Sequence, residues 1–516
     1  MHRLVQLEPV LSDTPLVPPG ATLGVLMRSD ATQEPVIEPN EQPKEVSALR
    51  SCPDELIAEI FSYGVAGPDD YRAFEIIRIN PERKIANFIV AAVCTRWRTI
   101  ALAYAKLWHY VAVPNLQSEK IAFQIPRIVS YMSLALERSR DAPFDLVFEY
   151  LAEDGLADLK ALEELLNTVG VHIQRLRRFS VVSDSGVIGP LLDLFRAPTP
   201  LLRTFELGYQ NSPENPTHNI HTFGIELDDD DIPAAPPILT YTPMLRNIVL
   251  INVPIAWKLW AGRNTQPVFD IELVQFELPT NFWETLASQT KLDWLTIRSD
   301  NVDISSVLPP TTGQKIILPE LRTLWVQDAA NLVFARDADT LETPNLDRLI
   351  VISIDLSIMK RFMGNIGVSV SQLTISYVWI DGVGAEGLRA LRHLERLQLV
   401  ESVTELTCLL KPLLLQASLQ PLQRDESHKL EQHVQFSDVV WPHLQLVEVF
   451  ALRIAKHERV LFDRLASDRK EAGPLDTHGK PGWRAVELTF SGCLDLEEVV
   501  ADGEIGDANG TDASPM

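Results

Sequence analysis

The sequence is short of cysteine, of positive charge and of long apolar runs, and each shortage excludes a class of protein. Its 516 residues include four cysteines, and none of them forms a Cys-x-x-Cys pair. Scattered thiols are typical of a reducing compartment and not of a disulfide framework. No stretch reaches the roughly 18 apolar residues of a membrane span, and the amino terminus lacks a basic region followed by an apolar run. We therefore expect a protein of the cytoplasm, the nucleus or both.

Basic residues are scarce relative to acidic ones. The 46 Lys and Arg face 70 Asp and Glu, which gives a formal net charge of −24 at pH 7. This charge repels a phosphate backbone, and no basic stripe with interleaved aromatic residues offsets it. The same field disfavours an anionic membrane surface. We predict neither nucleic acid nor a membrane as a partner.

The sequence also lacks the motifs of common catalytic sites. It has no Gly-x-Ser-x-Gly elbow, no phosphate-binding Gly-Lys-Ser/Thr loop and no His-Glu-x-x-His. Asp228 to Asp231 lack the alternating ligands and the turn glycine of a calcium loop. His218 and His221 have no cysteine or third histidine nearby. We predict no enzyme activity and no metal site.

One glycine-rich segment resembles a dinucleotide-binding loop. Gly382-Val-Gly384-Ala-Glu-Gly387 follows an apolar stretch that we expect to be a strand. Only about six residues separate Gly387 from the next expected strand, whereas a parallel crossover needs about a dozen. We interpret the glycines as a turn and predict no cofactor.

Length and composition divide the chain into regions. A chain of 516 residues exceeds a single hydrophobic core, so several domains or an elongated solenoid are expected. Residues 1–49 hold seven prolines and little periodicity, which predicts a disordered arm. Residues 495–516 hold seven acidic residues and no Lys or Arg, which predicts a disordered acidic tail.

The sequence pattern at residues 52–61, after the arm, predicts a first helix. Pro53 suits the first helical position, where its missing N–H costs nothing. Asp54 and Glu55 place negative charge at the positive end of the helix dipole. Leu56 and Ile60 are four residues apart and form one of two apolar rows.

A second helix is expected at about residues 87–105. Its apolar stripe includes Ile89, Val93 and Trp97. Two further apolar residues, Leu107 and Trp108, follow this helix. We expect Val93, Trp97, Leu107 and Trp108 to form the core of a helical module at residues 50–115.

These two segments together resemble the F-box-like domain in its fungal form. The residues that carry the resemblance are Pro-x-Glu-Leu-x-x-x-Ile-Phe, then Val-Cys-x-x-Trp-Arg-x-Ile-Ala and Leu-Trp. The resemblance implies docking on a Skp-type adaptor and, through it, on a cullin–RING ubiquitin ligase. It implies an adaptor contact at Cys52, which replaces the usual Leu, and at Pro53, Glu55, Leu56 and Ile60. The alternative is an ordinary helical hairpin of a larger α domain.

The region at 116–494 repeats a short strand pattern, Pro-x-Leu-x-x-Leu-x-Val/Leu, which begins at residues 200, 243, 319 and 344. Leu292, Leu321, Leu346, Leu373 and Leu394 are 29, 25, 27 and 21 residues apart, within the range of leucine-rich repeats. One strand and one helix cannot bury such an apolar face alone, so the units must stack.

The fold class that we predict is α/β: a helical F-box-like module and then an irregular leucine-rich-repeat-like solenoid, or horseshoe. Insertions at 208–237, 416–438 and 467–482 interrupt the repeats. A compact α/β domain with leucine-rich parallel strands is the alternative.

Two of the ten tryptophans are candidates for a substrate face. Trp325 and Trp379 lie within or just after expected strands, and aromatic residues are enriched at binding hot spots. The alternative is that they belong to the core.

The resemblance and the repeats together lead to an expected function. We expect a non-enzymatic substrate-recognition subunit of a Skp–cullin–F-box type ubiquitin ligase. Its helices would bind the adaptor and its solenoid a target protein that is then ubiquitinated. The alternative is a protein-binding scaffold in which the helices only cap the solenoid and recruit no ligase.

Overall fold

In the computed structural model the chain divides into two units, Met1–Cys52 and Pro53–Met516. The structure describes residues 51–65, 81–113, 121–151, 159–183, 185–209, 237–261, 267–274, 278, 281–299, 307, 309–310, 315–367, 369–401, 441, 443–450, 453–454, 456–471, 486–491 and 493–495. The expected arm at 1–49, the tail from 496 on and the insertion at 416–438 lie outside the described residues.

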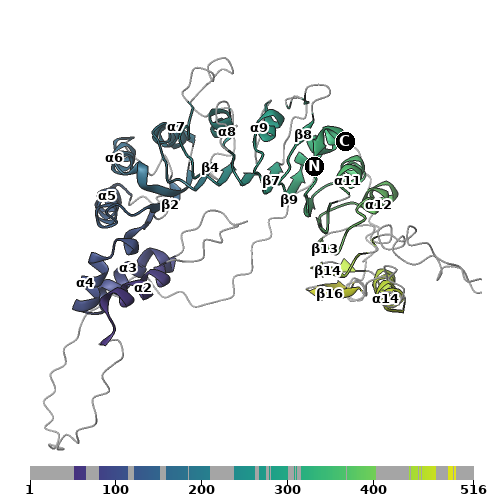
Figure 1. Cartoon of the computed structure of the whole chain (residues 1–516), viewed down its shortest axis with the longest axis horizontal. Helices are drawn as coiled ribbons and strands as arrows, with labels where there is room; N and C mark the ends of the chain where they lie inside the picture. Colours follow the sequence, from purple (N-terminus) through teal and green to yellow (C-terminus); the bar gives the residue numbers. More distant parts are fainter. Residues whose placement is uncertain are drawn as a thin grey trace, which may run out of the picture. The chain divides into compact units, whose positions relative to one another are not determined.

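The second unit contains a sheet of 13 strands (Figure 1), which confirms the α/β class. All neighbouring strands are parallel and follow one another in chain order. The strands are β1 (Tyr110–Val113), β2 (Phe144–Leu151), β3 (Leu176–Ser183), β4 (Thr204–Tyr209), β5 (Asn247–Ile251), β6 (Asp270–Val274), β7 (Trp294–Ser299), β9 (Thr323–Asp328), β11 (Arg348–Ile352), β12 (Gln372–Ser376), β13 (Arg396–Val400), β14 (Leu446–Phe450) and β16 (Glu487–Ser491).

Helices supply the crossovers that parallel strands require. Most strands are followed by a helix, and Figure 1 shows α5 to α9, α11 and α12 along one face of the sheet. The crossover helices are α5 (Ile121–Arg138), α6 (Leu159–Gly170), α7 (Ser185–Leu194), α8 (Pro254–Ala261), α9 (Phe282–Ser288), α10 (Ala330–Arg336), α11 (Lys360–Ile366) and α12 (Gly382–Arg389).

The remaining elements lie before β1, between repeats and near the end of the chain. The first helices are α2 (Asp54–Val65), α3 (Pro81–Val93), α4 (Thr95–Ala103) and the 3₁₀ turn η1 (Ala105–Trp108). Helix α14 (Lys456–Glu471) includes residues that we had assigned to an insertion at 467–482. Two further pairs of short strands are parallel: β8 (Ile316–Ile317) with β10 (Leu341–Glu342), and β15 (Arg453–Ile454) with β17 (Leu494–Asp495). Two further 3₁₀ turns are η2 (Ile173–Arg175) and η4 (Ala338–Thr340). Among the described helices none is long and apolar enough to cross a membrane.

Two positions in each strand from β1 to β14 of this sheet supply the core. Because side chains alternate between the faces of a strand, positions two apart share one face. The first of these rows consists of Val111, Leu146, Phe179, Phe205, Ile248, Ile271, Leu295, Leu324, Leu349, Leu373, Leu397 and Val447, which are all buried. The residue two positions later in each of these strands, from Val113 to Val449, is buried as well.

The register of the sheet corrects the repeat that we read from the sequence. Leu346 and Leu394 each precede their strand by two residues, whereas Leu373 lies inside β12. The residue equivalent to them is the buried Val370, so the steps of 27 and 21 residues become two steps of 24. The leucine count failed here because valine replaces the anchoring leucine. From Ile248 to Leu397, successive residues of the first core row are 23, 24, 29, 25, 24 and 24 residues apart.

The same backbone conformation recurs where strands end. Asn252, Ser353, Tyr377 and Glu401 each directly follow a strand, Asp328 ends one, and all five have a positive φ of 51° to 60°. This conformation costs a residue other than glycine about 1 kcal/mol. Its recurrence in register shows that the turn geometry is common to these units although no regular asparagine marks it in the sequence.

The glycine-rich segment at 382–387 forms the start of α12 and not a turn, which corrects our interpretation. Asp381 caps this helix, because its Oδ1 accepts a hydrogen bond from the Gly384 N–H at 2.7 Å. A Cβ on Gly387 would lie 2.9 Å from the Cα of Lys360 in α11. The glycine therefore allows α11 and α12 to pack closely, and the acidic cap disfavours a phosphate at this helix end.

Two glycines of neighbouring helices offer a test of this packing. We expect Gly387→Ala to destabilise the fold by about 1–3 kcal/mol, because the new Cβ meets the backbone of α11. Gly364→Ala in α11 has nothing within 4 Å of its new Cβ, and it should stabilise by roughly 0.5–1 kcal/mol through helix propensity. Denaturant titration of both variants measures the difference, and equal effects would contradict the packing argument.

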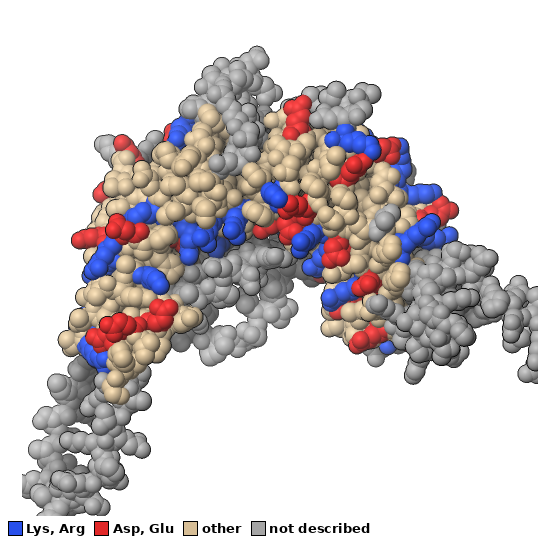
Figure 2. Space-filling view, in the orientation of Figure 1, with Lys and Arg blue, Asp and Glu red and all other residues tan. Residues whose placement is uncertain are grey.

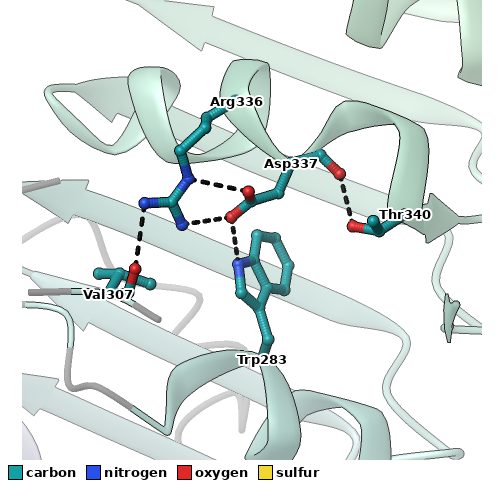
Figure 3. A network of polar contacts seen from close by, with 5 residues as sticks. All are labelled: Trp283, Val307, Arg336, Asp337 and Thr340. Carbon is teal, nitrogen blue, oxygen red and sulfur yellow. Dashed lines mark hydrogen bonds and ion pairs between the residues drawn. The ribbon is translucent and has the colours of Figure 1, made fainter. Parts of the chain in front are cut away.

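A buried polar network ties α9 to the end of α10 (Figure 3). The Asp337 carboxylate accepts hydrogen bonds from Trp283 Nε1 at 2.6 Å and from Arg336 Nε at 2.8 Å. Arg336 Nη1 also donates to the Val307 carbonyl at 3.0 Å, and Thr340 Oγ1 donates to the Asp337 carbonyl at 2.7 Å. Asp337 is only 5% exposed. The groups of this network satisfy one another, so its role is structural.

Removing the carboxylate at the centre of this network should be costly. We expect Asp337→Ala to destabilise the fold by about 2–4 kcal/mol, because it leaves the Arg336 charge and the Trp283 N–H without their shared acceptor. The control is Asp339→Ala, which breaks an ion pair with Arg361 whose two side chains are more than half exposed. The control substitution should lower the free energy of unfolding by less than about 1 kcal/mol. A smaller loss for Asp337→Ala in thermal denaturation would show that the network is not a structural link.

Candidate functional site

The first candidate site is the helical module formed by α2, α3, α4 and η1. Its interior contains Leu107 and Trp108, each 1% exposed, as predicted. Trp108 Nε1 donates to the Ala101 carbonyl at 2.8 Å. Trp97 is half-buried and packs on Phe61 of α2 with ring centroids 4.7 Å apart. These contacts hold the module together.

Polar contacts fix α2 against α4. Arg96 Nη2 lies 2.6 Å from the Asp54 carboxylate, and the Tyr104 hydroxyl donates to Glu59 at 2.7 Å. The hydrogen bond to Glu59 is the main cause that raises the pKa of Tyr104. Both contacts are exposed, so they orient the helices more than they stabilise them.

Helix α2 exposes one apolar face. Leu56, Ile60 and Tyr63 are 57%, 56% and 75% exposed. Their spacing of four and three residues places them on one side of the helix, while Ile57 and Phe61 are buried on another. Large exposed apolar clusters mark interaction sites. We call Leu56, Ile60 and Tyr63 the α2 face.

The predicted adaptor residues divide between this face and its surroundings. Pro53 and Glu55 are exposed, as are Leu56 and Ile60. Cys52 is half-buried and belongs to the first unit of the chain. Tyr63 was not predicted, although its distance of seven residues from Leu56 was a readable signal.

Helix α3 differs from its predicted role. Ile89 and Val93 are 55% and 56% exposed, so the expectation that Val93 lies in the module core is wrong. Phe88 instead contacts Trp108 and Tyr131 of α5, with centroid distances of 5.7 and 5.9 Å. The reason is that the helix expected at about residues 87–105 is two helices, because the chain leaves the helical conformation at Cys94. Ile89 and Val93 therefore lie on α3 and Trp97 lies on α4, so they do not form one stripe.

The second candidate is the sheet face opposite the described helices, which we call the open face. In its central row Trp325 lies between Thr296 and Ile350, which are only 1% and 4% exposed. Trp325 is half-buried there, and the Arg298 guanidinium lies 6.0 Å from its ring centroid. Arg298 Nε also donates to Gln327 Oε1 at 3.0 Å. Trp325 therefore lies on a sheet face, with a cation beside its ring.

The second predicted tryptophan lies elsewhere. Trp379 is 50% exposed and follows β12 by three residues. It forms a parallel bridge with Asp355, beyond the ends of β11 and β12. Trp325 lies within β9 and Trp379 beyond the carboxyl ends of strands, so the structure does not bring them together as one patch.

Charged side chains on the open face pair across strands. Arg177 binds the Asp145 carboxylate with two contacts of 2.8 and 2.7 Å. Arg178 contacts both oxygens of Glu206 at 2.9 Å, and the Ser180 hydroxyl donates to the same carboxylate. A similar group near the other end joins Arg396 and Gln398 to Glu448. These side chains neutralise one another.

No arrangement that could hold a metal emerges from the described part of the chain. Groups of three or more His, Cys, Asp or Glu in ligating positions are not found there. Asp228 to Asp231, His218 and His221 lie outside the described residues. Cys94 caps α4, because its Sγ accepts from the Trp97 N–H at 3.5 Å.

A scan against protein-family models and a search of curated proteins both return no match to this chain.

Glu272 is the open-face carboxylate with the largest change in acidity. It shares the central row with Val249 and Thr296. Burial is the main cause that raises its pKa to about 7; Arg298 opposes this shift and Glu206 adds to it. The ionised form of Glu272 is therefore less favourable in the folded chain than in the unfolded one.

Replacing Glu272 should reveal a pH-dependent penalty. Because the folded pKa of about 7 exceeds the ordinary 4.5, the penalty is absent below about pH 4.5 and grows until the pH passes 7. We expect Glu272→Gln to be more stable than the natural chain at pH 8 by about 1–3 kcal/mol, and equally stable near pH 4.5. Melting temperatures across this range measure the difference. The absence of such a trend in Glu272→Gln would refute the burial effect.

Proposed function

We propose that this chain is the substrate-recognition subunit of a Skp–cullin–F-box type ubiquitin ligase. The α2 face is the observation that carries the proposal. Leu56, Ile60 and Tyr63 are exposed on a helix whose other side is already buried in the module. Covering a Leu or Ile side chain contributes about 1.5–3 kcal/mol, so a partner helix laid on this face gains substantial binding energy.

The F-box-like module has the parts that such docking needs. The exposed Pro53 and Glu55 adjoin the α2 face in sequence, and Ile57 and Phe61 anchor α2 from behind. A rigid helix with an uncovered apolar side suits helix-to-helix recognition. We assign the adaptor contact to Pro53, Glu55, Leu56 and Ile60, with Tyr63 added.

We further propose that the sheet region is a leucine-rich-repeat-like solenoid. Three features support this architecture: strand neighbours in chain order, repeat steps of 23 to 29 residues between Ile248 and Leu397, and the recurring positive φ where strands end. Larger steps of 43 residues from Phe205 to Ile248 and of 50 from Leu397 to Val447 correspond to insertions or lost units. The open face of the solenoid, including Trp325, presents the target-binding surface, and Trp379 remains a second candidate at its edge.

In this proposal the protein carries out no chemistry itself. The adaptor joins it to a cullin–RING ligase, and the target bound to the solenoid is ubiquitinated by that assembly. We propose that it acts in the cytoplasm, the nucleus or both, with no cofactor.

A second function has its own support. Trp108 of η1 is buried and has the Arg138 guanidinium of α5 4.4 Å from its ring, and Phe88 of α3 contacts Tyr131 of α5. The module thus packs on the first repeat, as a cap of a solenoid core does. In this alternative the chain is a protein-binding scaffold that recruits no ligase.

Charge placed on the α2 face separates the two functions. We expect the double variant Leu56→Asp, Ile60→Asp to lose capture of a purified Skp-type adaptor by at least about tenfold, because two apolar contacts become unpaired charges. Pull-down of the full chain measures the loss. A cap needs no such surface, so undiminished adaptor capture by the double variant would reject the proposed docking.

The matched control is Val171→Asp, which charges a valine that is 81% exposed after α6. We expect it to capture the adaptor as the natural chain does. Equal melting temperatures of the variants and the natural chain show that the fold persists, because all three positions are exposed.

A further inference from the structure

The amino-terminal edge of β3, β4 and β5 carries a row of arginines. Arg177, Arg203 and Arg246 each lie just before the register rows of the sheet, and their backbones are joined. The Arg203 N–H donates to the Arg177 carbonyl at 2.7 Å, and the Arg246 N–H donates to the Arg203 carbonyl at 2.8 Å. The three side chains therefore leave the sheet from adjacent strands, which lie about 4.8 Å apart.

Two of these arginines are not neutralised. Arg177 pairs with Asp145, whereas Arg203 and Arg246 are exposed and form no ion pair or side-chain hydrogen bond with any described residue. Like charges on directly adjacent strands destabilise a sheet. At the same register just before β9, Arg322 lies 3.5 Å from Asp293. Arg203 and Arg246, just before β4 and β5, are thus an uncompensated exception.

Exposed apolar side chains accompany the two arginines. Leu201 and Met244 precede Arg203 and Arg246 by two residues, and each is 38% exposed. Phe269 continues the arginine row before β6 with 40% exposure, and the Arg246 guanidinium lies 5.6 Å from its ring centroid. Such a combination on one surface is typical of a recognition site.

Tyr241 extends this surface. It is 54% exposed, and its carbonyl accepts a hydrogen bond from the Thr199 N–H at 3.1 Å, which holds it beside the turn that leads into β4. We call the whole surface the basic–apolar edge: Leu201, Arg203, Tyr241, Met244, Arg246 and Phe269. In Figure 2 blue side chains gather along the lower margin left of centre, and red ones appear beside them nearer the centre.

We propose that the basic–apolar edge binds an extended acidic segment of a protein partner, in which carboxylates alternate with apolar residues. Alternate side chains of an extended peptide point to opposite sides. A peptide that runs across β4, β5 and β6 would therefore turn its carboxylates to Arg203 and Arg246 and its apolar residues to Leu201 and Met244. Guanidinium groups bind carboxylates with two parallel hydrogen bonds.

The net charge of the chain makes this local surface necessary. At −24 the molecule repels an acidic ligand elsewhere, so capture depends on uncompensated arginines. This inference deepens the proposed function, because it names the chemistry of the target, and it rests on that function only in identifying the bound protein as the ligase target.

Fluorescence anisotropy with the full chain and no adaptor tests the inference. The probe is a fluorescein-labelled peptide of about seven residues that alternates Glu and Leu, and the matched probe replaces every Glu with Gln. We expect the Glu peptide to bind with an affinity that falls as salt is added. The Gln peptide should bind at least about tenfold more weakly. The double variant Arg203→Gln, Arg246→Gln should lose at least about tenfold in affinity for the Glu peptide.

Arg322→Gln is the matched control, because it removes an arginine of the same register that is already neutralised. It should change the affinity by less than about twofold. Equal binding of the two peptides, or binding by the double variant within about twofold of the natural chain, would overturn the inference.

Two further arms exclude other anionic partners. Phosphatidylserine vesicles and a 20-nucleotide single-stranded DNA are offered to the same proteins. Tighter binding of either one than of the peptide, lost in the double variant, would overturn the assignment to an acidic protein segment. Peptide binding that depends on Arg203 and Arg246 supports the inference even where adaptor capture fails, so the two proposals fail separately.

Discussion

The register of the 13-stranded parallel sheet is the constraint on which the rest of the structure depends. Each strand from β1 to β14 in this sheet offers two buried positions, and the backbone ladder aligns them across the sheet, as Leu324, Leu349 and Leu373 show. A shift of one residue would turn the core side chains of a strand outward and polar ones inward. The buried rows therefore fix which residues reach every other surface of the repeats.

This constraint separates the stabilising part of the repeats from the part available for binding. The core rows and the helix layer, with its Asp337 network, satisfy their own apolar and polar groups. The open face and the strand edges are not needed to form this core. Charge there can therefore be compensated, as for Arg178 and Glu206, or left uncompensated, as for Arg203 and Arg246. Uncompensated charge held in place by a rigid ladder is pre-organised for a partner.

The sequence allowed the strands and their inward residues to be predicted because the anchoring residue and the two core positions repeat at fixed offsets. It misplaced one unit at Leu373, since Val370 fills the anchor position and carries no leucine signal. It also read the glycines at 382–387 as a turn. Their role depends on the nearby Lys360 backbone in α11, a tertiary contact that local spacing does not contain.

The candidate site was predictable to a similar extent. Leu56 and Ile60 followed from the motif, and both are exposed. Val93 did not follow its stripe, because the chain leaves the helical conformation at Cys94 and the stripe is divided between α3 and α4. Trp325 could be placed on a strand, but the cation beside it comes from the neighbouring β7. The arginine row was invisible in the sequence, because its members lie 26 and 43 residues apart and only the register unites them.

Two of the surfaces to which we assign binding, the α2 face and the basic–apolar edge, differ in physical kind. The α2 face offers apolar area on one helix, whose contribution to binding depends little on salt. The basic–apolar edge combines apolar contact with charge, which salt screens over about 10 Å at 0.1 M. Assembly with an adaptor and selection of a target would then rest on different forces, held on separate elements of the chain. A substitution that weakens one surface leaves the other intact, since α2 and the β4–β5 edge share no side chain.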